Sequence, residues 1–274
     1  MQKLIINFTP TGMIPTKSLT SHVPISPSEI IEQVHEVYEI GITLVHLHAR
    51  SEDGKPTYKI NIYREIVEGI RKYCPDLVLG VSLSGRSNPE FEKRSQVLEL
   101  QPDMGSLTLS SLNFSTQASM NSPEMIQKLA LKMNELGVHP ELECFDSGMI
   151  HYSKYLIRKG ILRPPFYFNL LVGNIFNAQL DLATIGLMVR DLPSNSHWSL
   201  AGLGNHQLAA NSIAIAAGGG VRVGLEDNIW LDQKRTILAT NLELIQRIHS
   251  LAAIAERPIM GAKEFGELGF YNSK

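Results

Sequence analysis

The sequence predicts an α/β protein in which residues 1–274 form a single (β/α)8 barrel, the TIM-barrel architecture. The first observation is a short apolar run typical of a strand followed by an amphipathic helical stretch, a pair that occurs eight times along the chain. The second is the strict alternation of the two, which is typical of a parallel sheet with helices packed outside it. Each pair takes about 34 residues, the size of a strand–helix–strand unit, and eight such units favour closure into a barrel.

The expected strands lie at residues 4–8, 44–48, 77–83, 104–109, 141–145, 166–172, 197–203 and 221–225. The expected helices lie at about residues 27–40, 61–73, 89–100, 122–136, 147–159, 179–190, 207–217 and 232–255. The first helix has the clearest start, because Ser26 suits the N-cap, Pro27 the first helical position and Glu29 the acidic first turn. Gly41 is the expected end of that helix.

The later elements follow the same pattern of an apolar run, a polar loop and an amphipathic stretch. Ser122-Pro123-Glu124 opens the fourth helix as Ser26-Pro27-Ser28-Glu29 opens the first. Gly218-Gly219-Gly220 predicts a tight turn into the eighth strand, which precedes the long closing helix. An open doubly wound sheet is the alternative, but the loop after the first strand lacks the G-x-G-x-x-G fingerprint of that fold.

The composition excludes several classes of protein. Hydrophobic residues make up 43% of the chain and charged residues 19%, which allows a large core and excludes general disorder. The 25 Lys and Arg residues are balanced by 27 Asp and Glu residues, so no positive excess favours nucleic-acid binding. The two cysteines, Cys74 and Cys144, lack the spacing of a metal motif and suit a reducing compartment. Without a signal peptide or an uncharged apolar run of about 18 residues, we expect a cytoplasmic protein with no membrane partner.

Polar side chains gather where the expected strands end, which is where a barrel of this kind carries its active site. His46 and His48 end the second strand and share one face of it, about 6–7 Å apart along the strand. Two imidazoles in this arrangement can bind one metal ion. The alternative is a pair of partly buried histidines that are hydrogen-bonded to their neighbours.

The eighth strand ends in a guanidinium and a carboxylate on one face, Arg222 and Glu226. Two histidines and one carboxylate are a ligand set of catalytic zinc that leaves a position open for substrate, and Glu226 is the best candidate carboxylate. The alternative is a buried Arg222–Glu226 ion pair that closes the barrel. Asp227 points elsewhere and could pair with Arg222.

The fifth strand alternates carboxylates with apolar residues, which is costly inside a barrel unless the carboxylates meet cations or a polar cavity. Glu143, nearer the carboxyl end, is the functional candidate, whereas Glu141 is expected to be structural. Hydroxyl groups end the third and fourth strands, and they can form turns or donate to a substrate carboxylate. These are Ser82, Ser106 and Thr108.

Taken in order, these residues resemble the β-keto acid cleavage enzyme family over essentially the whole chain. The resemblance rests on His46-Leu47-His48, Ser82, Met104-Gly105-Ser106-Leu107, Glu143 with Ser147-Gly148-Met149, Gly202-Leu203-Gly204 and the most specific motif, Arg222-Val223-Gly224-Leu225-Glu226-Asp227-Asn228. It implies a zinc-dependent barrel, usually a homotetramer, that condenses a β-keto acid with acetyl-CoA and releases acetoacetate and a new acyl-CoA.

The resemblance also implies roles for individual residues. His46, His48 and Glu226 would bind zinc, and Arg222 would remove an α-proton with the help of Asp227 and Glu143. Ser82 and Ser106 would bind the substrate's carboxylate or keto oxygen. Arginine is a poor base because its pKa exceeds about 12. An alternative therefore stays open, in which Arg222 holds an anion electrostatically.

Two positions depart from the family. Members that accept an amino-tailed keto acid tend to carry an acidic residue near position 14, where this chain has Ile14 and no carboxylate before Glu29. The departure predicts a substrate with an uncharged tail. Asn205 follows Gly202-Leu203-Gly204 where a basic residue is often found, which bears on contacts with CoA phosphates.

Three other functions compete with this interpretation. A metal-dependent acyl-CoA lyase or aldolase shares the enolate chemistry but would cleave its substrate without added acetyl-CoA. Amidohydrolase-type hydrolases place their H-x-H motif after the first strand rather than the second. A scaffold without catalysis has no reason to collect Glu143, Arg222 and Asp227 at one mouth.

Overall fold

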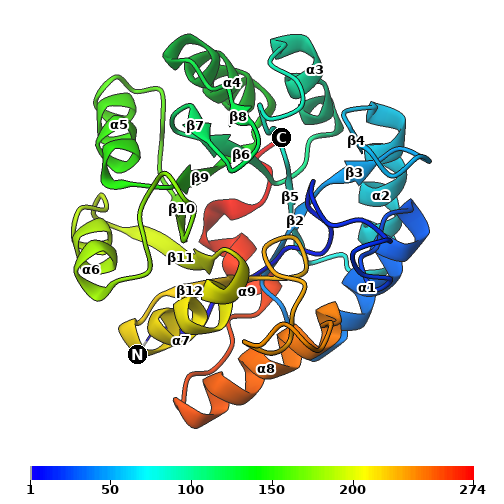
Figure 1. Ribbon diagram of the computed structural model, residues 1–274. Coiled ribbons are helices and arrows are strands. Elements are labelled where there is room, and N and C mark those ends of the chain that lie inside the picture. The colour runs from blue at the N-terminus through cyan, green and yellow to red at the C-terminus, as the bar shows by residue number, and fades with distance from the viewer. Residues whose placement is uncertain (1) are drawn as a thin grey trace.

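The protein, described over residues 2–274 by a computed structural model, is a closed barrel of eight parallel strands (Figure 1). This confirms the predicted α/β barrel and excludes the open sheet. In barrel order the strands are β1 (Ile6–Phe8), β12 (Gly220–Val223), β11 (Ser196–Gly202), β10 (Phe166–Val172), β9 (His139–Cys144), β6 (Met104–Thr108), β5 (Val78–Val81) and β2 (Leu44–Leu47). Each corresponds to one of the eight predicted runs.

Helices form a ring around these strands (Figure 1). They are α1 (Pro27–Ile40), α2 (Ile60–Tyr73), α3 (Phe91–Ser95), α4 (Pro123–Leu136), α5 (Ser147–Arg158), α6 (Leu182–Arg190), α7 (Gln207–Ala217) and α8 (Asn241–Ile254). The predicted start of α1 is confirmed as a capping box. The Glu29 amide donates to the Ser26 hydroxyl, and the Ser26 amide donates back to the Glu29 carboxylate.

The predicted closing helix is wrong at its start, because α8 begins at Asn241 rather than near Asp232. The Asp232 carboxylate accepts hydrogen bonds from the amides of Thr236 and Ile237, which holds this segment as a turn. The helix starts only where Thr240 and Glu243 form a second capping box. Residues 228–240 therefore form a loop at the carboxyl ends of the strands.

One predicted helix differs in form, and two further parts of the structure were not predicted. The third helix is short and continues as a 3-10 turn over Gln96–Leu100. Two hairpins, β3–β4 (Ala49–Arg50 with Pro56–Thr57) and β7–β8 (Leu112–Asn113 with Ala118–Ser119), lie in loops that follow barrel strands. The C-terminal segment adds α9 (Ala262–Phe265) and a π-helical turn (Gly266–Phe270), which pack Phe265 and Phe270 against the amino-terminal ends of the strands.

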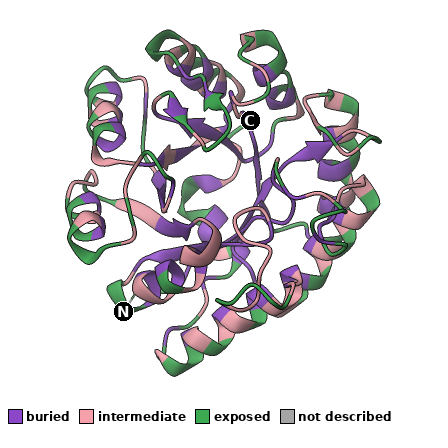
Figure 2. Ribbon diagram, viewed as in Figure 1, coloured by how far each residue is buried: buried purple, intermediate pink, exposed green. Residues whose placement is uncertain are grey.

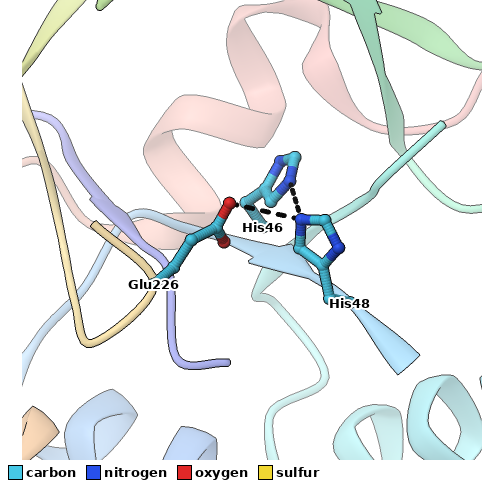
Figure 3. A group of neighbouring side chains, drawn as sticks. All are labelled: His46, His48 and Glu226. Carbon is cyan, nitrogen blue, oxygen red and sulfur yellow. Dashed lines mark hydrogen bonds and ion pairs between the residues drawn. The ribbon is translucent and has the colours of Figure 1, made fainter. Parts of the chain in front are cut away.

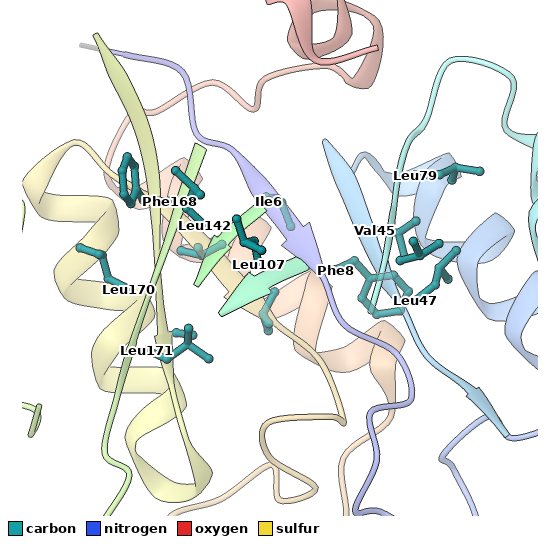
Figure 4. Packing of buried hydrophobic residues seen from close by; sticks show 14 of the residues in the cluster. Ile6, Phe8, Val45, Leu47, Leu79, Leu107, Leu142, Phe168, Leu170 and Leu171 are labelled. Atoms are coloured by element: carbon teal, nitrogen blue, oxygen red, sulfur yellow. The ribbon is translucent and has the colours of Figure 1, made fainter. Parts of the chain in front are cut away.

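The apolar core lies between the strands and the ring of helices (Figures 2 and 4). Side chains such as Val45, Leu47 and Leu79 point into this layer, and burying each one contributes about 1.5–3 kcal/mol. The opposite face of the same strands carries buried polar groups inside the barrel, among them Asn7 and His46. Within residues 2–274 every helix is too short or too polar to cross a membrane.

Candidate active site

A cavity of about 830 Å³ opens at the carboxyl ends of the barrel strands. Its walls include every predicted site residue except Ser106. The predicted residues in the wall are His46, His48, Ser82, Thr108, Glu143, Arg222, Glu226 and Asp227. Residues far apart in the sequence are thus brought to one place, because all of them follow or end parallel strands that share an edge.

Three potential metal ligands converge at the base of this cavity (Figure 3). His46 and His48 lie on the same face of β2 and its extension, with their Nε2 atoms 3.2 Å apart. The Nε2 atom of His48 is 3.2 Å from Oε1 of Glu226, and one ligand atom from each of the three residues lies within 4.8 Å of the others. Within residues 2–274, the buried Oε2 of Glu226 has no hydrogen-bond partner. An orphaned carboxylate oxygen beside two imidazole nitrogens fits the donor set that zinc prefers.

Glu141, which was expected to be structural, lies directly behind His46. Its Oε2 is 2.6 Å from His46 Nδ1, and both side chains are buried. Its Oε1 accepts hydrogen bonds from the side-chain amides of Asn7 and Asn169. A carboxylate at Nδ1 places the imidazole proton there, so the lone pair of Nε2 faces the cluster. Sequence reasoning missed this role, although Glu141 shares its strand face with Glu143.

The position of Glu226 depends on a glycine in the first loop. Gly12 has φ +62°, and a Cβ atom on it would lie 2.5 Å from Cγ of Glu226. Any other residue there would displace this carboxylate. The backbone helps too, because the amide of Glu226 donates to the carbonyl of Thr9 over 3.2 Å.

Arg222 is 2% exposed and touches three carboxylates. Its Nη2 is 2.7 Å from Glu226 Oε1, its Nε is 3.0 Å from Asp227 Oδ2, and its Nη1 is 3.5 Å from Glu143 Oε1. The hydroxyl of Thr108 donates to Glu143 Oε2 over 2.6 Å. The buried Arg222–Glu226 pair therefore exists together with the histidine cluster, and Glu226 belongs to both.

The charges of the site shift its pKa values in opposite directions. Burial works against the charge of Arg222, but Asp227, Glu226 and Glu143 outweigh it and raise the pKa of Arg222 well above its ordinary value. Sequence alone left the direction of that shift open. Burial raises the pKa of Glu143 and of Asp227, and the nearby Arg222 offsets this only in part. Burial also opposes the charge of Glu226, but His48 and Arg222 hold its pKa well below the ordinary range.

Comparison with known proteins finds one family over nearly the whole chain. Residues 3–268 match the model of a family described as beta-keto acid cleavage enzyme. The chain belongs to the β-keto acid cleavage enzyme family. It is 35% identical over 261 residues to the 3-keto-5-aminohexanoate cleavage enzyme of Fusobacterium nucleatum, which covers 94% of both chains. It is also 35% identical over 262 residues to the 3-oxoadipate:acetyl-CoA acetyltransferase of Cupriavidus necator, with 94% of this chain and 91% of the relative covered.

A solved structure supports the fold of this family member. The complex of ObcA with oxaloacetate superposes with a TM-score of 0.81 and 20% sequence identity, covering 92% of this chain and 68% of the ObcA chain. The shared feature is the barrel itself. As a β-keto acid cleavage enzyme family member, the chain is an enzyme.

The three hydroxyl residues predicted for the site differ in whether they reach the cavity. Ser82 and Thr108 line the cavity. Ser106 is buried, and its Oγ accepts a hydrogen bond from the amide of Leu83 over 3.0 Å, so it braces the loop after β5. His206, which no motif placed, also lines the cavity.

Apolar and polar side chains share the cavity wall beyond the histidine cluster. Ile14, from the first loop, is 56% exposed, and Phe114 packs edge-on against Phe145. Arg86 stacks on Phe114, with its guanidinium carbon 3.4 Å from the ring centroid. Leu203 also lines the cavity.

Proposed function

We propose that this chain is a zinc-dependent β-keto acid cleavage enzyme that acts on acetyl-CoA and a β-keto acid with an uncharged tail. Its products are acetoacetate and the acyl-CoA of the tail. The observation that carries the proposal is the convergence of His46, His48 and Glu226 beside Arg222 at the base of an open cavity. This ligand set fits catalytic zinc and leaves a position for substrate.

The first step needs a proton to leave C2 of the keto acid. A metal ion bound by His46, His48 and Glu226 supplies a Lewis acid that stabilises the negative charge developing on the keto oxygen. The raised pKa of Arg222 keeps it positively charged, which supports the electrostatic role over the role of base. Glu143 is then the better base, because its pKa is raised by burial and it contacts Arg222 only at 3.5 Å.

The remaining steps exchange one acyl group for another. The C2 carbanion attacks the thioester carbon of acetyl-CoA, a C2–acetyl bond forms and the CoA thiolate leaves. The thiolate then attacks C3, the C2–C3 bond breaks, and C2 takes back the proton to give acetoacetate. Asp227 fixes the orientation of Arg222 through this sequence, because its Oδ2 lies 3.0 Å from Arg222 Nε.

The substrate carboxylate is assigned to the hydroxyl group of Ser82, and Ser106 braces the loop after β5 that begins there. The hydroxyl of Thr108 donates to Glu143, so Thr108 is assigned to orienting that carboxylate beside the substrate. The tail is assigned to the wall that includes Ile14. The relatives from Fusobacterium and Cupriavidus are named for keto acids with an amino tail and a second carboxylate. Ile14 lines the cavity and is 56% exposed, and its side chain offers no partner to either charge, which favours an apolar tail.

The test is a panel of β-keto acids with neutral, cationic and anionic tails, assayed for acetoacetate with and without acetyl-CoA. We expect turnover with neutral tails and only when acetyl-CoA is present. Cleavage without acetyl-CoA would instead identify a lyase. Turnover confined to cationic tails would contradict the assignment of Ile14, and turnover confined to anionic tails would point to Arg86. The homotetramer that the resemblance implies is tested by light scattering, and the cytoplasmic location expected from the sequence is tested by cell fractionation.

A further inference from the structure

The cosubstrate of the proposed reaction carries charges that the catalytic cluster does not accommodate. CoA has a diphosphate and a 3′-phosphate at the end of the molecule opposite the thioester. These groups are strongly hydrated, so they stay near the cavity's opening while the thioester reaches its base. A site for acetyl-CoA therefore needs a cation at the rim, and arginine is well suited because it binds phosphate with two hydrogen bonds.

Three arginines line the cavity, and they differ in how their charge is balanced. Arg222 is surrounded by three carboxylates. Arg86 is half-buried and stacked on Phe114. Arg235, in the loop between β12 and α8, is exposed at the rim. In the described part of the chain, no carboxylate lies within ion-pair distance of Arg235, so its charge is free to meet an anion.

The side chain of Arg235 is held in place although it is exposed. Its Nε donates to Oδ1 of Asn205 over 2.7 Å, and the neighbouring Gln233 donates from Nε2 to the carbonyl of Asn205 over 3.1 Å. The guanidinium lies over Gly204, where a Cβ atom would be 3.7 Å from Nη2. Because Asn205 uses only Nε, the two terminal NH2 groups keep their donors for a ligand.

The backbone conformation of Arg235 also helps to fix the direction of its side chain. Its φ is +58°, a left-handed conformation that is unfavourable for a residue with a side chain. Asp232 holds the turn, since its carbonyl accepts from the amide of Arg235 and its carboxylate accepts from Thr236 and Ile237. The loop thus maintains a strained turn that directs a cation toward the cavity opening.

We propose that Arg235, oriented by Asn205, binds a phosphate group of CoA at the rim of this cavity. The proposal rests on the proposed function for the identity of the cosubstrate. It assigns the recognition of the phosphates to the loop between β12 and α8, in the part of that loop that follows Asp227 in the sequence.

The test compares two thioesters that carry the same acetyl group. Acetyl-CoA has the phosphates and acetyl-pantetheine lacks them. We expect Arg235→Ala to raise KM for acetyl-CoA roughly tenfold or more, with little change in kcat and no change for acetyl-pantetheine. Asn205→Ala should produce a smaller effect of the same selectivity. Lys234→Ala is the matched control, because it removes an adjacent exposed positive charge that does not line the cavity.

Two outcomes overturn the proposal. An equal loss with both thioesters would show a structural effect of Arg235, and a raised KM for the keto acid alone would make Arg235 part of the tail site. Failure of the proposed function is distinguishable, because the wild type would then turn over neither thioester. In that case calorimetric titration with CoA decides: binding by wild type and Lys234→Ala but not by Arg235→Ala supports the phosphate site, and equal binding or none by all three rejects it.

Discussion

Glu141 Oε2 lies 2.6 Å from His46 Nδ1, and this buried contact aims the other ring nitrogen of His46 at His48 and Glu226. The contact crosses the barrel from β9 to β2. It is held from the other side by the amides of Asn7 and Asn169, which donate to Oε1 of the same carboxylate. A carboxylate that hydrogen-bonds a metal-binding imidazole both orients it and makes it a stronger ligand.

Glu141→Gln should therefore weaken zinc binding, by about 10- to 100-fold. The measurement is competition with a chromophoric chelator, which reports affinity without turnover. Tyr167→Phe is the matched control, because it removes a hydroxyl that donates to Asn169 and leaves the His46–Glu141 contact intact. Equal affinity in wild type and Glu141→Gln would reduce Glu141 to the structural role that the sequence suggested.

The same contact predicts how pH affects the metal-free protein. Burial lowers the pKa of His46, but Glu141 and Glu226 outweigh it and raise that pKa from 6.5 to about 9. A group whose folded pKa is raised stabilises the fold fully below its unfolded value and loses this contribution as pH rises through the folded value. The free energy of unfolding of the metal-free protein should thus fall between about pH 6.5 and 9.

Denaturant titrations of the metal-free protein across this range measure that fall. Zinc binds neutral imidazole, so the zinc-loaded protein should lack it. The variant Glu141→Gln should show a smaller fall, because only Glu226 of the two carboxylates is left to raise the pKa of His46. A fall of the same size in all three samples would assign the pH dependence to other groups.

The barrel could be predicted because its signal is repeated. Eight apolar runs alternate with amphipathic stretches, so a wrong boundary for one element does not change the prediction of a barrel. The missed elements lack such repetition. The spacing of apolar residues predicted that the closing helix begins near Asp232. In the structure the side chain of Asp232 accepts hydrogen bonds from the amides of Thr236 and Ile237, and this segment is a turn instead. Phe265 and Phe270 stack across the far end of the barrel, a contact that depends on the finished fold.

The candidate site was predictable where residues two apart share a strand face, as His46 and His48 do. Roles that depend on contact between strands were not. Glu141 meets His46 from 95 positions away, and Ser106 turns its oxygen to the amide of Leu83 instead of the cavity. The sign of the Arg222 pKa shift also needed the positions of three carboxylates.

Gly12→Ala should lower zinc affinity as well as stability. The new methyl group would lie 2.5 Å from Cγ of Glu226 and displace it, and the left-handed backbone adds a cost of about 1–2 kcal/mol. Gly160→Ala is a control with matched strain, because Gly160 has φ +71° and no atom within 4 Å of a new Cβ. Both variants should unfold at lower denaturant concentration, and only Gly12→Ala should release zinc more easily. Loss of zinc affinity in both would mean that backbone strain alone accounts for the effect.

Glu143→Gln should slow exchange of the C2 hydrogens of the keto acid with deuterated solvent by about 100-fold or more, the usual contribution of a general base. Arg222→Lys keeps the positive charge and should retain most of this exchange, provided that metal analysis shows zinc still bound. In the wild type, exchange should decline on the acid side at a pH above the ordinary carboxyl value of 4.5, because burial raises the pKa of Glu143. Fast exchange in Glu143→Gln with slow exchange in zinc-loaded Arg222→Lys would return the role of base to Arg222.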